Sequence, residues 1–163
     1  MRETTGGFTS AQLALEAQSL ILPSFSISDA LEIGEIAVQI GRERTLPIAI
    51  EVRIGEWTIF HASLPGAEPS NTSWIVRKAR VVLATGNSTM YERVLSQEHG
   101  VDWHIQTGNS EETHAIHGGG FAINEKGVGF VGALLISGLP QVEDHLLCVE
   151  VIAEFLARKG ELQ

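Results

Sequence analysis

Two segments of the chain alternate apolar and other residues with the period of two that is typical of β-strands. Apolar side chains occupy every second position from Ile48 to Ile54, and a two-residue Gly-Glu turn follows. The return strand covers residues 57–62. A second hairpin is predicted from "GGFAI", a turn at residues 124–127, and "VGFVGALLIS". Because the last of these strands is apolar on both faces, we expect it in the centre of a sheet.

Helical signals come before the first hairpin. Thr9 and Gln12 have the spacing of a capping box, so a first helix is predicted to open at Thr9, and Pro23 helps to end that region. A short strand is expected in "LILPSFS". Ser28 is then predicted to cap a second helix, which ends before Pro47.

Three further helices are predicted after the first hairpin. One covers residues 72–85, and a second capping-box pattern begins a short helix at Thr89. The polar segment at 100–112 is expected to be an exposed loop. Pro140 suits the first turn of a long last helix that stops at Gly160. Together these elements predict a single α+β domain over residues 1–163, with an antiparallel sheet flanked by helices.

Composition and charge narrow the function classes. The chain has 163 residues, of which 44% are hydrophobic and 19% charged, so it is typical of a globular domain with apolar surface left for a subunit interface. Its formal charge of −9, with 11 basic residues, argues against nucleic acid or an anionic membrane as partner. No apolar run reaches the roughly 18 residues of a membrane span. No membrane association is therefore expected.

The chain contains one cysteine and shows no secretory signal at its start. Cys148 lies between Leu147 and Val149, which favours a small buried hydrophobe over a reactive thiol. The first 22 residues lack an unbroken apolar core and a small-residue cleavage site. Both observations predict a cytoplasmic protein.

The segment from His117 to Phe121 reads His-Gly-Gly-Gly-Phe, a sequence that many esterases use to stabilise an oxyanion. An esterase also needs a serine in Gly-x-Ser-x-Gly downstream of these glycines, and none is present. The hydrolase interpretation is therefore rejected. Two interpretations of Gly118, Gly119 and Gly120 remain open: they bring backbone amides close to a ligand or a neighbouring chain, or they form a crowded turn.

Six histidines raise the question of a metal, but none lies in a recognised ligand motif, and no metal site is expected. His114 and His117 would share a metal only if their loop were helical, and the glycines argue against that. His117 has three open roles: a donor to a ligand carboxylate, an axial heme ligand, or a structural hydrogen bond. His61, at a strand end, and His145, at the start of the last helix, are expected to be neutral acceptors.

Lys78 is the most informative charged residue, because helical geometry places it between Trp74 and Val82 on an apolar stripe. Such a lysine extends along the edge of the core, pairs with a carboxylate, or faces an anionic ligand. Asp144 is the available carboxylate near a helix start, where it also stabilises the helix dipole. We expect Lys78 and Gly119 to meet at a shared cavity.

An ordered set of short motifs gives the chain a specific resemblance. From residue 20 to residue 156 it resembles the GlcG-like and HbpS-like heme-binding or heme-degrading domains, and in particular their small cytoplasmic branch. The motifs that carry the resemblance are Phe60-His61, Leu64-Pro65-Gly66, Arg77-Lys78, His117-Gly118-Gly119 and Gly138-Leu139-Pro140.

The resemblance implies a profilin-like three-layer sandwich with a five-stranded antiparallel sheet, symmetric homo-oligomers, and heme as a candidate cofactor. Two functional hypotheses follow. In the first, the protein binds heme or another compact anionic ligand, which some members of the family degrade. The ligand-binding residues expected under this hypothesis are Lys78, His117, Gly118, Gly119, Gly120, His61, Asp144 and His145. In the second, it is a non-catalytic assembly protein in which these residues are structural.

Overall fold

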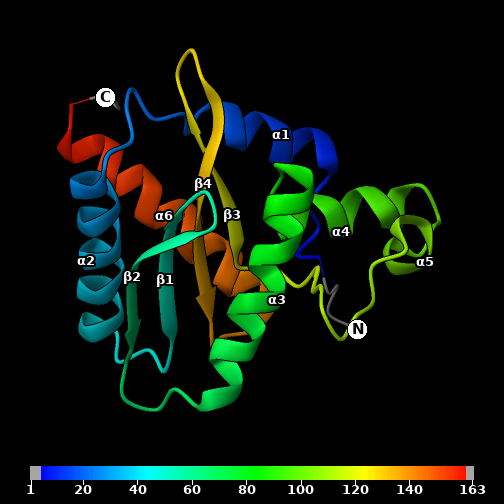
Figure 1. Ribbon diagram of the computed structural model, residues 1–163, viewed down its shortest axis with the longest axis horizontal. Helices are drawn as coiled ribbons and strands as arrows, with labels where there is room; N and C mark the ends of the chain where they lie inside the picture. The colour runs from blue at the N-terminus through cyan, green and yellow to red at the C-terminus, as the bar shows by residue number, and fades with distance from the viewer. Residues whose placement is uncertain (1–4, 161–163) are drawn as a thin grey trace.

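The computed structural model describes residues 5–160 and combines two antiparallel hairpins with six helices (Figure 1). In chain order the elements are α1 (Ser10–Gln18), α2 (Ile27–Glu43), β1 (Ala49–Ile54), β2 (Trp57–Ser63), α3 (Pro69–Thr85), α4 (Thr89–Glu98), α5 (Trp103–Thr107), β3 (Gly120–Glu125), β4 (Gly129–Ser137) and α6 (Gln141–Arg158).

The two hairpins join into one antiparallel sheet with the strand order β2-β1-β4-β3. Both predicted hairpins are confirmed, and β4, apolar on both faces, is central as expected. The expectation of five strands is wrong, because the sheet of residues 5–160 has four. Leu22 makes only an isolated parallel bridge with Glu125. Pro23 follows at once and has no N–H with which to continue a ladder, so "LILPSFS" does not become a strand.

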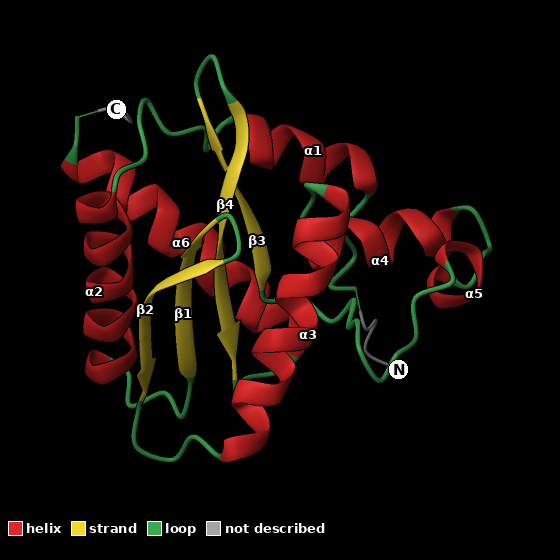
Figure 2. Ribbon diagram, in the orientation of Figure 1, coloured by secondary structure: helices red, strands yellow, loops and turns green. Residues whose placement is uncertain are grey.

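Helices cover both faces of the sheet, which confirms the predicted architecture of an antiparallel sheet flanked by helices (Figure 2). On one face, β1 side chains such as Ile50 pack into a large core with α2 and α6. On the other, the neighbouring β1 residue Ala49 packs with Ile75 and Ala79 of α3. The alternation along each strand thus directs successive residues into two different cores.

Three helix starts illustrate how capping determines the boundaries. Thr9 and Gln12 form the predicted capping box of α1. For α2 the predicted cap Ser28 is wrong, because Ser26 forms a box with Asp29 and starts the helix two residues earlier. Ser88, not Thr89, caps α4. Thr89 is instead fully buried, and its hydroxyl accepts a hydrogen bond from the backbone amide of Gly120.

Two other predicted boundaries change. The segment expected to be a loop at 100–112 contains the short helix α5, which Asp102 caps by accepting the Ile105 amide at 3.1 Å. Helix α3 begins at Pro69 rather than residue 72, since proline is tolerated in a first turn. Helix α6 follows Pro140 as expected. Among residues 5–160 no helix is long and apolar enough to cross a membrane.

Candidate functional site

A cavity of about 250 Å³ lies where α3, the start of α6, the end of β4 and the glycine loop meet. Three residues that the sequence singled out, Lys78, His117 and Asp144, line this cavity together. Its walls are formed by Asn71, Trp74, Lys78, His117, Ser137, Gly138, Leu139, Gln141 and Asp144.

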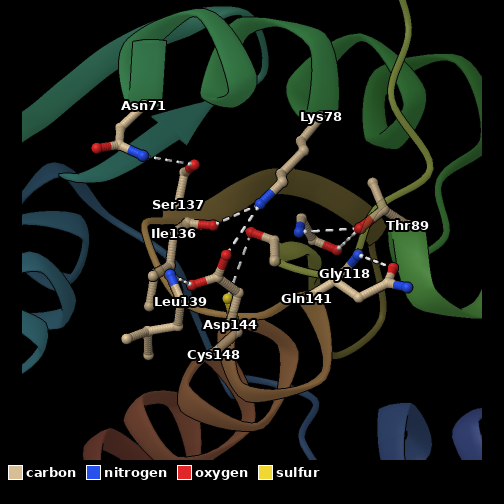
Figure 3. Close-up of polar contacts among 12 residues, drawn as sticks. Asn71, Lys78, Thr89, Gly118, Ile136, Ser137, Leu139, Gln141, Asp144 and Cys148 are labelled. Atoms are coloured by element: carbon tan, nitrogen blue, oxygen red, sulfur yellow. Dashed lines mark hydrogen bonds and ion pairs between the residues drawn. The ribbon is translucent and has the colours of Figure 1, made fainter. Parts of the chain in front are cut away.

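Lys78 is buried and its ammonium group is held by two acceptors (Figure 3). Nζ donates to the carbonyl oxygen of Ile136 at 2.9 Å and to Oδ2 of Asp144 at 3.3 Å. Of the three interpretations of this lysine, pairing with a carboxylate is the observed one. Burial lowers the pKa of Lys78, and the neighbouring Asp144 opposes that effect.

Asp144 is anchored on both sides, in the first turn of α6. Oδ2 faces Lys78, while Oδ1 accepts the Leu139 amide at 3.1 Å. Burial raises the pKa of Asp144 to about 6, although the Lys78 ammonium and the backbone donors act in the opposite direction. The pair is therefore a buried ion pair whose acidic member titrates close to neutral pH.

Of the three glycines, Gly119 places its backbone directly against this pair, although none of the three lines the cavity itself. A Cβ at Gly119 would lie 2.7 Å from Nζ of Lys78. Two of the amides already have protein acceptors: Gly118 donates to Oε1 of Gln141 at 3.2 Å, and Gly120 donates to the Thr89 hydroxyl at 3.0 Å (Figure 3). These bonds fix the loop, so the amides of Gly118 and Gly120 are not turned freely toward a ligand.

His117 differs from the other cavity residues because neither of its ring nitrogens has a hydrogen-bond partner among residues 5–160. Nδ1 is also buried. The imidazole packs edge-on against the Trp74 indole, with 4.6 Å between ring centroids. Burial lowers the pKa of His117 to about 4, and the nearby cations Arg93 and Lys78 add to this effect. His117 is therefore a neutral imidazole at neutral pH.

The other two histidines proposed from the sequence lie away from the cavity. His61, on the edge strand β2, has Nδ1 3.0 Å from Oε1 of Glu51. His145 is buried in α6 with Nε2 2.8 Å from Oε1 of Glu16. Since an ionised carboxylate only accepts hydrogen bonds, the facing nitrogen of each histidine donates. The expectation that both act as acceptors is wrong for these nitrogens.

Two further expectations concern cysteine and metal. Cys148 is fully buried, with Sγ 3.5 Å from the Gly119 carbonyl oxygen, and burial raises the pKa of its thiol. This confirms the expected buried hydrophobe. Within residues 5–160 no three His, Cys, Asp or Glu side chains gather in an arrangement that would hold a metal ion.

Four cavity residues did not emerge from the sequence: Asn71, Trp74 as a wall, Ser137 and Gln141. Ser137 Oγ lies 3.4 Å from the Asn71 amide nitrogen, across the end of β4 (Figure 3). These residues come from three different elements, so no spacing in the sequence joins them. The one usable signal is the Gly-Leu-Pro that ends β4 and places Gln141 at the start of α6.

The raised pKa of Asp144 predicts a pH-dependent contribution to stability. A group whose pKa rises on folding, here from 3.8 to about 6, stabilises the fold below pH 4, and that contribution is lost as the pH rises through 6. The loss is about 3 kcal/mol, because one pKa unit corresponds to about 1.4 kcal/mol. Denaturant unfolding of wild type and Asp144→Asn from pH 4 to 7 measures this loss. The free energy of unfolding of wild type should fall relative to that of Asp144→Asn as the pH rises.

The comparison with Asp144→Asn is needed because His117 acts in the opposite direction. Its lowered pKa gives a contribution that is present above pH 6.5 and is lost as the pH falls through about 4. A difference between wild type and Asp144→Asn that stays constant from pH 4 to 7 would contradict the raised pKa of Asp144.

Comparison with known proteins identifies the family to which this chain belongs. A family model described as "Haem degrading protein HbpS-like" matches residues 25–153. The chain therefore belongs to the HbpS-like family. It is 38% identical over 158 residues to a UPF0303 protein of Streptomyces avermitilis, with 97% of each chain covered. A UPF0303 protein of Rhizobium johnstonii is 36% identical over 148 residues, covering 91% of each chain.

Solved structures share the fold. The crystal structure of the protein Ybr137w superposes with a TM-score of 0.83 at 25% identity, covering 91% of this chain and 88% of that one. PduOC, crystallised in complex with heme, has a TM-score of 0.68 at 20% identity over 80% of this chain and 94% of its own. A double mutant of HbpS from Streptomyces reticuli has a TM-score of 0.63 at 17% identity, covering 80% and 86%.

Proposed function

We propose that the protein binds a compact anionic ligand, with heme as the candidate that the family provides, at the cavity lined by Lys78, His117 and Asp144. The observation that carries the proposal is the His117 imidazole, which is neutral and has no hydrogen-bond partner for either nitrogen among residues 5–160. A buried imidazole nitrogen without a hydrogen-bond partner costs free energy unless a ligand in the cavity supplies that partner.

The His117 imidazole fits heme, whereas the volume of the cavity limits how much of it can be enclosed. A neutral imidazole with a free nitrogen is a suitable axial ligand, and His117 would hold the iron. Bound heme would supply redox chemistry at that iron. The cavity of about 250 Å³ is smaller than the roughly 300–1,000 Å³ that encloses a drug-sized ligand, so it would not enclose the whole macrocycle.

Lys78 would provide the positive charge for an acidic group of the ligand. An ammonium has three N–H donors, and two are used by Ile136 and Asp144. The third would serve the ligand, while Asp144 keeps the lysine in place. Behind the wall, Gly118 would leave room for the backbone of Gln141, Gly119 for Lys78 and Gly120 for Thr89.

We infer in addition that the chain is one profilin-like domain over residues 1–163, located in the cytoplasm, that assembles into a symmetric homo-oligomer. Support for assembly comes from large apolar side chains on the surface, because Leu15, Trp57 and Ile105 are 67%, 62% and 82% exposed.

The second candidate function is that of an assembly protein without a ligand. One observation favours it: Lys78 and the amides of Gly118 and Gly120 all have acceptors inside the protein. Under this hypothesis the cavity residues stabilise the subunit and neither bind a ligand nor catalyse a reaction. A ligand titration distinguishes the two candidates.

Titration with hemin tests the proposal directly. Wild type is expected to shift the Soret band of hemin, and His117→Ala is expected to lose that shift because the axial nitrogen is gone. His114→Ala is the matched control, since His114 lies in the same loop but does not line the cavity. Both are followed by absorbance spectroscopy at equal protein concentration.

An unchanged spectrum in His117→Ala would remove this residue from the ligand set. A ligand other than heme is tested with acetate, following the indole N–H resonance of Trp74 in wild type and His117→Ala. If neither hemin nor acetate binds to wild type, the assembly function is the better supported one.

A further inference from the structure

A second cavity, of about 200 Å³, lies on the other side of His117. It is bounded by α4, the start of α5 and the loop that leads into the glycines, and His117 contributes to the walls of both cavities. The residues that give it chemical character are Arg93, His104, Glu111 and His117.

Arg93, on α4, is the only basic residue in the wall of this second cavity, and it is half-buried. Its Nε donates to the carbonyl oxygen of Ile116 at 3.3 Å. Among residues 5–160 its two terminal nitrogens have no hydrogen-bond acceptor, and no carboxylate lies within 4.0 Å. Burial lowers the pKa of the guanidinium, since desolvation disfavours its charge.

Three of the other arginines in residues 5–160 are neutralised by carboxylates. Arg44 pairs with Glu150, Arg53 with Glu51 and Arg158 with Glu154. In the part of the chain that the structure describes, Arg77 is also half-buried without a carboxylate partner, but it donates through Nε and one terminal nitrogen to the Glu111 carbonyl oxygen, whereas both terminal nitrogens of Arg93 are left free. Its charge and its planar pair of free nitrogens match the geometry of a carboxylate or phosphate oxyanion.

The acidic residues of this cavity are directed elsewhere. The Glu111 side chain is 78% exposed, and its Oε1 lies 3.7 Å from Nε2 of His104. Asp102 accepts the Ile105 amide and caps α5. Neither carboxylate satisfies the terminal nitrogens of Arg93, so a site for an anion is left at the guanidinium.

We propose that the cavity at Arg93 is a second binding site, which takes a small oxyanion such as phosphate or the carboxylate of a small organic acid. The guanidinium of Arg93 binds two oxygens of the anion through its terminal nitrogens. The neutral His117 ring adds a wall that carries no competing negative charge. This site shares the His117 ring with the cavity at Lys78 but uses a different cation.

Calorimetric titration with inorganic phosphate and, separately, with acetate tests the proposal on the full chain. Wild type is expected to bind at least one of the two, and the stronger one identifies the source of the oxyanion. Arg93→Gln should weaken that binding at least about tenfold, because it removes charge-assisted hydrogen bonds. Binding should also weaken with added salt.

Arg77→Gln is the matched control. Arg77 is also half-buried and its Nε also donates to a carbonyl of the same loop, that of Glu111 at 2.9 Å, but it does not line the second cavity. Its replacement should change anion binding less than about twofold. Equal weakening in Arg77→Gln and Arg93→Gln would overturn the proposal, and so would the absence of binding to wild type.

A second variant keeps the test informative if Arg93→Gln does not fold. Glu111→Gln removes the nearest competing negative charge and should strengthen anion binding about twofold to threefold. Unchanged or weaker binding in this variant would contradict the site at Arg93. Lys78→Met separates the two proposals, because Lys78 lines the first cavity and not the second. Loss of hemin binding with retained phosphate or acetate binding in this variant concerns only the first cavity.

Discussion

Replacing Gly119 by alanine is expected to lower the free energy of unfolding by about 3 kcal/mol or more. The added Cβ would overlap the carbonyl oxygen of Ile136 and lie 2.9 Å from Cβ of Asp144. Neither neighbour can move easily, since one is backbone in a central strand and the other is anchored in an ion pair. In addition, φ of Gly119 is +117°, which side-chain-bearing residues rarely adopt.

Gly127→Ala is the control that separates backbone strain from steric overlap. Gly127 also has a positive φ, +79°, but no atom lies within 4 Å of a Cβ built there. Its replacement should cost only about 1 kcal/mol. Equilibrium unfolding in urea measures both variants. Equal destabilisation of the two would show that Gly119 is required for its φ and not for its contact with Ile136 and Asp144.

Lys78→Met is expected to lower the free energy of unfolding by about 3 kcal/mol at neutral pH. The substitution leaves the Asp144 carboxylate buried without its ammonium partner, and only backbone donors such as the Leu139 amide remain. Lys126→Met is the control, because Lys126 is exposed in the β3–β4 turn and should change stability by less than about 0.5 kcal/mol.

The double variant Lys78→Met/Asp144→Leu tests the cause of this loss. Replacing both charges by apolar groups should recover most of the lost stability, since no unpaired charge then remains. A double variant no more stable than Lys78→Met would refute the ion pair as the source. Light scattering on the same proteins also tests the assembly function, which predicts that the subunit count changes when Lys78 is lost.

The alternation of side chains was sufficient to predict both hairpins and the central position of β4, because strand periodicity is local. Helix starts were less certain where several hydroxyl residues are adjacent. The Ser26-x-x-Asp29 capping box was present in the sequence. The helix starts there and not at Ser28, because the side chains of Ser26 and Asp29 each accept the backbone amide of the other residue. The fifth strand implied by the resemblance does not form for an equally local reason. Pro23, directly after Leu22, has no N–H with which to continue the ladder.

The candidate site could be predicted only in part. The position of Lys78 on an apolar helix stripe predicted its burial, and the run of glycines predicted a close approach. The choice of Asp144 as partner could not be derived, because it lies 66 residues away and is brought near by tertiary packing. Arg93 carried no signal, since its lack of a carboxylate partner becomes visible only when the surrounding charges are placed.

The burial of Cys148 under the glycine loop gives the molecule an internal reporter. Thiol reagents attack the thiolate, and at this position the sulfur contacts the carbonyl oxygens of Gly119 and Leu134. Reagent reaches it only when α6 separates from the sheet. The rate of labelling of this single cysteine is therefore expected to measure how often α6 separates from the sheet, without any introduced probe.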